Sequence, residues 1–208
     1  MAALIKAAAA ADYPAEIVLV VSNRADALGL ERAKAAGIAT VVIESKPFGK
    51  DRTAFEAALQ RVLDQHRIEL ICLGGFMRLF TAAFAQSWYG RMLNIHPSLL
   101  PSFPGLDPQG QAMRAGVKIS GATVHFVIAK TDAGPILMQG AVAVSDYDSA
   151  ETLSERILEV EHRIYPDALR LLATGAVRLE GEICKTPDSA GSGNFLISPV
   201  ASADGTSA

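Results

Sequence analysis

The stretch EIVLVVSNRADALGLERAKAAGIATVVI, residues 16–43, carries the pattern from which we predict the fold. Its first six residues form a nearly continuous apolar run rich in valine and isoleucine, which is typical of a strand buried on both faces. Polar turn residues follow, and then a segment with helical spacing that stops at Gly37. Residues 40–43 are the next short strand. This order of strand, helix and strand indicates an α/β fold with a parallel sheet.

The same alternation continues along the chain until two strands joined by a short turn, residues 122–128 and 135–144, which we expect to be antiparallel. Pro166 is expected to kink or divide the last helix. We therefore predict a Rossmann-like, open and mostly parallel sheet with helices on both faces. The remaining predicted elements are strands at residues 69–73 and 92–96 and helices at residues 2–11, 51–66, 81–89, 109–116 and 148–175.

The composition limits the class of protein. The chain has 208 residues, of which 50% are hydrophobic and 20% charged, as expected for a folded soluble domain. A formal charge of −3 without a Lys/Arg cluster argues against a nucleic-acid partner. Every apolar run is far shorter than the ~20 residues that a membrane helix needs. Two cysteines make neither a disulfide framework nor a four-cysteine zinc site, so a reducing cytoplasm is expected.

The C-terminal end differs in composition from the rest of the chain. Residues 187–208 are rich in serine, glycine and alanine, and we predict that they form a disordered tail. Residues 1–186 are predicted to form a single domain.

The motif LNIHPSLLP places two polar side chains at the end of an apolar strand. Asn94 and His96 are two residues apart, so their side chains point to the same side of the strand. A histidine is the usual general acid or base near neutral pH, and an asparagine amide can donate a hydrogen bond to a developing oxyanion. The alternative is a histidine whose hydrogen bonds are satisfied by the proline-rich loop that follows.

Two further segments carry candidate binding or catalytic residues. In GGFMRLF, residues 74–80, adjacent glycines after a strand either allow a ligand to approach the backbone or form a tight turn. In TVHFVIAKTDAGPIL, Thr123 and His125 share one strand face, and Asp132 follows in the loop. A carboxylate near an imidazole favours the charged imidazole and fixes its tautomer. The alternatives are a structural His125 and a turn-forming Asp132.

Taken together, these segments resemble the phosphoribosylglycinamide formyltransferases, folate-dependent enzymes of purine (IMP) synthesis. The resemblance extends from the first residues to about Gly175 and is carried by SNRADALGLERAKAAGI, GGFMRLF, LNIHPSLLPSFPGL, GATVHFV, DAGPIL and EHRIYP. It implies transfer of a formyl group from 10-formyltetrahydrofolate to the amine of glycinamide ribonucleotide. It implies no metal, no nucleic acid and no membrane, and a monomer or homodimer.

The resemblance also implies roles for individual residues. Asn94 would hydrogen-bond the oxyanion, His96 would be the general acid, and Asp132 would keep His96 protonated and assist proton movement. Thr123 and His125 would support the loop that carries Asp132. The folate site would comprise Arg52, Met77, Arg78, Leu79, Phe80, Asn94, Ile128, Ala129, Lys130, Thr131 and Asp132. The ribonucleotide would contact Leu158, Glu159, Val160 and above all Glu161, although by spacing alone this segment is an ordinary solvated helix face.

The sequence departs from the family pattern in two places. The family has a histidine where this chain has Asp107, which adds a negative charge near the folate or phosphate side. The family also begins with a strand and a glycine-rich loop, ending in Gly-Ser-Asn, that cradles the substrate phosphate, and we expect this chain to lack both. The alternatives to an active enzyme of this family are an inactive folate-binding remnant, a formyltetrahydrofolate hydrolase and a methionyl-tRNA formyltransferase.

Overall fold

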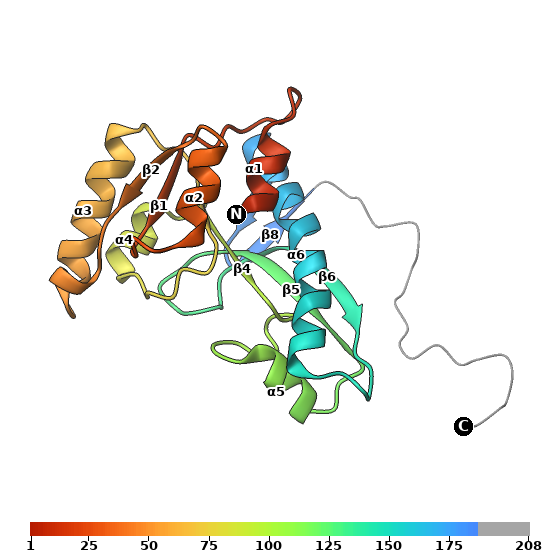
Figure 1. Cartoon of the computed structure of the whole chain (residues 1–208). Helices are drawn as coiled ribbons and strands as arrows, with labels where there is room; N and C mark the ends of the chain where they lie inside the picture. Colours follow the sequence, from red (N-terminus) through yellow and green to blue (C-terminus); the bar gives the residue numbers. More distant parts are fainter. Residues whose placement is uncertain (187–208) are drawn as a thin grey trace, which may run out of the picture.

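The computed structural model describes residues 1–186 as helices packed around β-strands (Figure 1). The predicted tail, residues 187–208, lies outside the described residues. The elements run in the order α1 (Ala2–Ala8), β1 (Leu19–Ser22), α2 (Leu28–Ala35), β2 (Ala39–Val42), the short 3₁₀ helix η1 (Lys46–Phe48), α3 (Arg52–Gln65), β3 (Ile71–Leu73), α4 (Ala82–Ser87), β4 (Met92–His96), α5 (Pro108–Arg114), β5 (Ile119–Phe126), β6 (Ile136–Ala143), α6 (Ala150–Ala173), β7 (Arg178–Glu180) and β8 (Ile183–Lys185).

The largest sheet has four strands in the order β3-β4-β5-β6. β3 and β4 are parallel, whereas β5 runs antiparallel to both of its neighbours, β4 and β6. The antiparallel pairing of β5 with β6 confirms the prediction made from their short connection. A register shift between Val124 and His125 interrupts this pairing next to a polar side chain of β5.

Neighbouring residues of β4 face opposite sides of this sheet. Leu93 packs into a core with α1, β5 and α6, whereas Met92 packs into a second core with α3 and α4. Both side chains are 0% exposed. Because a strand alternates its side chains between two faces, helices cover both sides of the sheet, as predicted.

β1 and β2 form a separate parallel pair, in which Leu19 lies opposite Ala39. All four residues of β1 are half-buried, and Val18 just before it is 39% exposed. The prediction of a strand that starts at residue 16 and is buried on both faces was therefore wrong. β2 is the one strand that pairs with β1 in the described part of the chain, and it begins at Ala39. Because Ala39 lies opposite Leu19, the pairing of β1 starts at Leu19. A strand paired on one edge leaves part of its surface in solvent.

α6 lies along the sheet and closes one side of the core (Figure 1). Ser149 and Thr152 form a capping box at its start. The helix continues through Pro166, so of the two expected outcomes, a kink or a division, the division is excluded. The Pro166 carbonyl accepts a hydrogen bond of 2.7 Å from the hydroxyl of Tyr13, which ties the segment before β1 to this helix.

The ends of two other helices test the predicted boundaries. The side chain of Asp51 accepts a hydrogen bond from the amide of Ala54 at 2.9 Å, so the predicted N-cap of α3 is confirmed. α1 ends at Ala8 and not at residue 11. Ala9 and Ala10, which follow the helix, form turn hydrogen bonds that lead to Tyr13.

Candidate active site

The polar end of β4 lies against β5, which places Asn94 opposite His125 and His96 opposite Thr123. Residues two apart on one strand and directly opposite on its neighbour share a sheet face, so the four side chains form one cluster. His96, His125 and Thr123 are buried, and Asn94 is half-buried. The period of two thus brings together the side chains that the sequence marked as candidates.

Both ring nitrogens of His96 have a partner. Its Nε2 lies 3.0 Å from the carbonyl oxygen of Phe103, which can only accept, so Nε2 carries a hydrogen. Its Nδ1 lies 3.6 Å from Oδ2 of Asp132, and the two side chains are 8% and 10% exposed. At this distance Asp132 is an ion-pair neighbour of the ring and not a hydrogen-bond partner.

Asp132 joins the loop after β5 to the loop after β4. Its backbone is in the left-handed region at φ +50°, which few residues other than glycine adopt. Oδ2 accepts a hydrogen bond from the amide of Gly105 at 2.9 Å, and Oδ1 lies 3.8 Å from Nε2 of His125. A purely local turn residue does not fit this arrangement, because the amide that it binds lies 27 positions away in the chain.

His125 is held between the backbone of β5 and the side chain of Asn94. Its Nδ1 lies 3.0 Å from the carbonyl oxygen of Phe126, and its Nε2 lies 3.2 Å from Nδ2 of Asn94. Burial lowers the pKa of His125, and the backbone hydrogen bond and the charge of Asp132 act in the opposite direction. The net lowering favours a neutral imidazole at this position near neutral pH.

Thr123 holds a different loop from the one predicted. Its hydroxyl donates to the carbonyl of Ser98 at 2.7 Å, and it accepts from the amide of Leu100 at 3.0 Å and from the side chain of Gln139 at 2.9 Å. These hydrogen bonds fix the proline-rich loop after β4 and not the Asp132 loop. The predicted support of the Asp132 loop by Thr123 was therefore wrong, and His125 alone of the two lies near Asp132.

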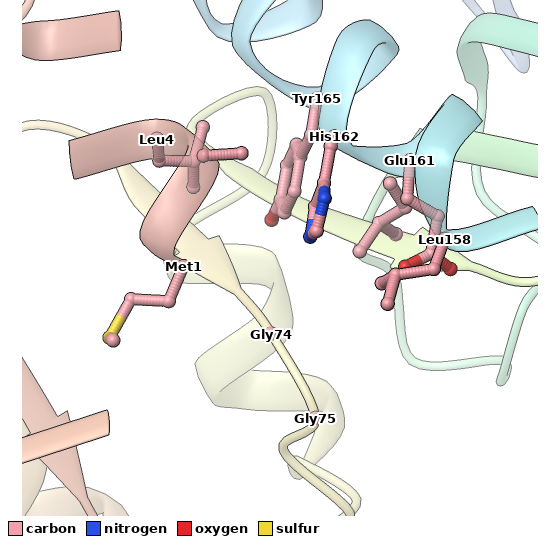
Figure 2. A pocket seen from close by; sticks show the side chains of 10 residues that line it. Met1, Leu4, Gly74, Gly75, Leu158, Glu161, His162 and Tyr165 are labelled. Carbon is pink, nitrogen blue, oxygen red and sulfur yellow. The ribbon is translucent and has the colours of Figure 1, made fainter. Parts of the chain in front are cut away.

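A cavity of about 190 Å³ lies next to the turn that follows β3 (Figure 2). Four residues of α6 line it at positions i, i+3, i+4 and i+7 from Leu158, which is the spacing of one helix face. Burial raises the pKa of the Glu161 carboxyl, so this acid is partly withdrawn from water. The cavity is lined by Met1, Ala3, Leu4, Gly74, Gly75, Ile95, Leu158, Glu161, His162 and Tyr165.

Comparison with known protein families matches residues 1–169 to the family described as formyl transferase. The chain belongs to the formyl transferase family. It is 42% identical to the phosphoribosylglycinamide formyltransferase of Bacillus subtilis over 161 residues, which are 77% of this chain and 82% of that protein. The crystal structure of glycinamide ribonucleotide transformylase 1 from Symbiobacterium toebii matches with a TM-score of 0.85 at 45% identity, covering 89% of this chain and 87% of that one. The predicted fold class is confirmed.

A longer relative is similar to this formyl transferase over part of its length. The trifunctional purine biosynthetic protein adenosine-3 of Gallus gallus is 53% identical over 172 residues, 82% of this chain. The chain spans only 17% of the length of that protein. The similarity therefore concerns one region of the trifunctional relative.

Two of the four residues of α6 predicted to contact the ribonucleotide line the cavity of this formyl transferase, and two do not. Leu158 and Glu161 line it. Glu159 is exposed. The side chain of Val160 packs so closely on Gly140 of β6 that a Cβ atom added to Gly140 would lie 2.3 Å from it. His162 and Tyr165 line the cavity without having been predicted, and the helical intervals from Leu158 onward are the signal that identifies them.

The predicted folate contacts of this formyl transferase lie on two loops and at the start of α3. Met77 and Leu79 are 73% and 58% exposed, which is high for apolar side chains. Between them, the guanidinium of Arg78 covers the ring of Phe55 at 4.9 Å, and the ring of Phe80 stacks on two neighbouring phenylalanines. Of the remaining predicted contacts, Arg52, Ala129, Lys130 and Thr131 are exposed and Ile128 is half-buried.

Asp107 has a structural role in this formyl transferase. Its backbone is left-handed at φ +55°, and its side chain caps α5 by accepting from the amide of Gly110 at 3.2 Å. Arg114 pairs with the same carboxylate at 3.1 Å. The charge predicted near the folate or phosphate side is therefore paired with a cation from the same helix.

Across residues 1–186, no group of three His, Cys, Asp or Glu side chains is placed to hold a metal ion. In the same residues, no helix is both long and apolar enough to cross a membrane. The site presents an amide donor, an imidazole and a carboxylate next to one another, which are the groups that acyl transfer to an amine uses.

Proposed function

We propose that this formyl transferase moves the formyl group of 10-formyltetrahydrofolate to the amine of glycinamide ribonucleotide, a step of purine biosynthesis. The observation that carries the proposal is the cluster of Asn94 and His96 at the end of β4 with Asp132 of the loop after β5, in which the His96 and Asp132 side chains are 8% and 10% exposed. An imidazole and a carboxylate that are withdrawn from water cost free energy to bury, and ionisable groups of this kind gather at functional sites.

The three residues divide the work of the reaction. The folate supplies the formyl carbon, the amine forms a new C–N bond to it, and the bond from that carbon to the folate nitrogen breaks. Asn94 donates a side-chain N–H to the formyl oxygen while negative charge develops there. His96 gives its proton to the departing folate nitrogen, and Asp132 stabilises the imidazolium before this transfer and takes part in removing the proton of the attacking amine.

The surface next to this cluster fits a flat and partly apolar co-substrate. Met77 and Leu79 expose apolar area in the loop after β3, and a pteridine ring would cover it. The loop that ends at Asp132 presents exposed backbone and side chains at residues 129–131, next to the catalytic carboxylate. Within residues 1–186, the Asn94 side chain makes one hydrogen bond, to His125, so one N–H is left for a ligand.

The cavity beside α6 fits the amine substrate. Gly74 and Gly75 bring backbone close to it, and Glu161 supplies a carboxylate that accepts from sugar hydroxyls or from an ammonium group. Ile95, the residue between the two catalytic side chains of β4, lines the same cavity. Ile95 faces the α6 side of the sheet and Asn94 and His96 face the other side, so an amine bound in the cavity would reach them past the end of β4.

An assay of formyl transfer tests this proposal. Transfer of formyl from 10-formyltetrahydrofolate to glycinamide ribonucleotide is expected, and Asn94→Ala is expected to lower kcat by about 10²–10³-fold, the usual cost of one oxyanion donor. Absence of transfer by the unchanged protein contradicts the proposal. Release of formate at the same rate without the amine indicates a hydrolase instead.

The amine side is tested by a matched pair on α6. Glu161→Gln is expected to raise KM for the ribonucleotide by roughly 10-fold through loss of a charged hydrogen bond and to leave KM for the folate unchanged. Glu159→Gln changes the same charge two residues away on the exposed face of the helix, and both KM values should stay as they are. Equal effects of the two substitutions would contradict the assignment of the cavity.

A further inference from the structure

The hydrogen-bond partners of His125 determine which of its nitrogens carries the proton. Nδ1 lies 3.0 Å from the backbone carbonyl oxygen of Phe126, which has no hydrogen to donate. Nδ1 must therefore carry the hydrogen of that bond. A neutral His125 then has a free lone pair on Nε2.

The lone pair on Nε2 determines how the side-chain amide of Asn94 is turned. Nε2 lies 3.2 Å from Nδ2 of Asn94, so the amide donates one N–H to the imidazole. The second N–H of the same Nδ2 is left over, and the amide oxygen points away from His125. If Nε2 also carried a hydrogen, the amide would have to rotate by half a turn, and its oxygen would take the place of Nδ2.

We propose that His125 is a positioning residue whose neutral, Nδ1-protonated form turns the Asn94 amide so that an N–H faces the formyl oxygen. The inference rests on the proposed function, because that function makes Asn94 the oxyanion donor. With the amide reversed, a carboxamide oxygen would face the formyl oxygen and repel the charge that develops on it. His125 thus contributes to the rate through Asn94 and without contact with either substrate.

The surroundings of His125 keep it in this form. Its side chain is 3% exposed, and burial disfavours the imidazolium. Two ionisable groups face it, His96 from β4 and Asp132 from the loop after β5. Asp132 favours the charged form, but its Oδ1 is 3.8 Å from Nε2, which is too far for a hydrogen bond to a proton there. The charge on His96 acts against a second charge on His125.

Two isosteric substitutions separate the proposed role from a merely structural one. In His125→Asn the amide nitrogen takes the place of Nδ1 and keeps the bond to Phe126, but nothing accepts from Asn94. In His125→Gln the terminal amide takes the place of Nε2, and its oxygen accepts from Asn94 while the bond to Phe126 is lost. Only His125→Gln preserves the orientation of the Asn94 amide in which Nδ2 faces residue 125.

Steady-state kinetics of the two variants give opposite expectations. His125→Asn is expected to lose about 10- to 100-fold in kcat, part of the 10²–10³-fold that loss of an oxyanion donor costs, with both KM values within about threefold. His125→Gln is expected to keep kcat within about fivefold of the unchanged protein. Equal losses of kcat in the two variants, or a larger loss in His125→Gln, would overturn the inference.

The Asn94→Ala background distinguishes this inference from the proposed function. If the unchanged protein shows no transfer, the proposed function fails; if it transfers formyl and Asn94→Ala alone retains full transfer, the function stands, but the oxyanion role of Asn94 fails and this inference fails with it. If Asn94→Ala is impaired, adding His125→Asn should lower kcat no further, since the group that it positions is already gone. A further loss in the double variant would show that His125 acts by another route and would overturn the inference alone.

A spectroscopic measurement on the free protein does not depend on activity. With ¹⁵N-labelled histidine, the NMR signals of the His125 ring are expected to show a hydrogen-bearing Nδ1 and an unprotonated Nε2 at pH 7. The side-chain amide signals of Asn94 should shift in His125→Asn and stay near their original positions in His125→Gln. A ring with its hydrogen on Nε2 contradicts the proposal whatever the kinetics show.

Discussion

The sheet β3-β4-β5-β6 and the pair β1-β2 differ in burial, although the strands of the pair are at least as apolar. Val124 and Phe126 of β5 are 0% exposed, whereas every residue of β1 is half-buried and Val42 of β2 is 40% exposed. The candidate catalytic residues all lie on or next to the buried strands. β4 and β5 are hydrogen-bonded on both edges, and β1 and β2 are bonded only to each other within the described residues.

This difference explains where the site can be built. Burying His96, His125 and Thr123 requires a partner for each polar atom at a fixed distance, and inner strands supply those partners from both neighbours and from the loops. A strand with one free edge moves more easily, because part of its backbone bonds to water. The contrast predicts that substitutions in the four-stranded sheet affect activity and stability more than equivalent ones in the β1-β2 pair.

The largest expected effect is on the rate. His96→Ala removes the proposed general acid and is expected to lower kcat by about 10²–10⁴-fold, the range for acid–base groups. Val42→Ala in β2 shortens an exposed side chain and should leave kcat within about twofold. Formyl-transfer kinetics at pH 7 measure both, and a comparable loss in the two variants would contradict the contrast.

A matched pair of valine substitutions tests stability. Val124→Ala in β5 is expected to lower the free energy of unfolding by roughly 2 kcal/mol or more, from the lost transfer energy of two methyl groups and the cavity that remains. Val21→Ala in β1 is expected to cost roughly half as much, because its side chain is already partly in water. Urea unfolding measures both values, and equal costs would show that the two regions are equally buried in solution.

Tyr165 tests the connection between α6 and the inner strands. Its hydroxyl oxygen lies 2.7 and 3.2 Å from the carbonyl oxygens of Leu73 and Leu93, which share its one hydrogen. Tyr165→Phe leaves both buried carbonyls with one partner fewer, and the expected cost is about 1–2 kcal/mol. Tyr89→Phe removes an exposed hydroxyl bonded to the carbonyl of Gly181 and should cost about 0.5 kcal/mol or less. Thermal unfolding of the two variants under identical conditions measures the loss of unfolding free energy in each.

The smallest expected effect is the pH dependence of stability. Burial lowers the pKa of His125 below its unfolded value of 6.5, so the folded state binds its proton less readily than the unfolded chain does. The stability that His125 contributes is complete above pH 6.5 and is lost as the pH falls from 6.5 toward its folded pKa. His125→Gln should flatten the unfolding free energy in this window. β1 and β2 contain no ionisable side chain, so substitutions there should leave the profile unchanged.

Of the two strands that are paired on both edges, β4 was predicted to the residue and β5 was not, since it was predicted as residues 122–128 and runs from Ile119 to Phe126; the bounds of β1, which has a free edge, were also wrong. Met92–His96 has the predicted bounds, because its apolar run and the proline that follows define both ends. The run from residue 16 is equally apolar, but pairing starts only at Leu19, where a neighbour is available. Apolar composition reports the tendency to form a strand, and tertiary pairing decides how much of the run forms one.

In the candidate site, too, local spacing predicts some of the contacts and tertiary packing decides the others. Asn94 and His96 on one side of a strand follow from the period of two, and so does the pairing of Thr123 with His125 on another. The carbonyl of Phe103 on His96 and the amide of Gly105 on Asp132 come from loops, whose backbone groups leave no mark in the sequence. For the same reason, the sequence assigned Thr123 to the wrong loop.

The residue pattern alone determined the alternation of strands and helices, the faces on which polar side chains lie, and the resemblance to the formyl transferase family, because each depends on local spacing. Tertiary structure decided that β1 and β2 form a separate pair, that Leu158, Glu161, His162 and Tyr165 share a cavity with Gly74, and that His125 accepts from Asn94. These contacts join residues far apart in the chain, so they exist only once the strands and helices have packed.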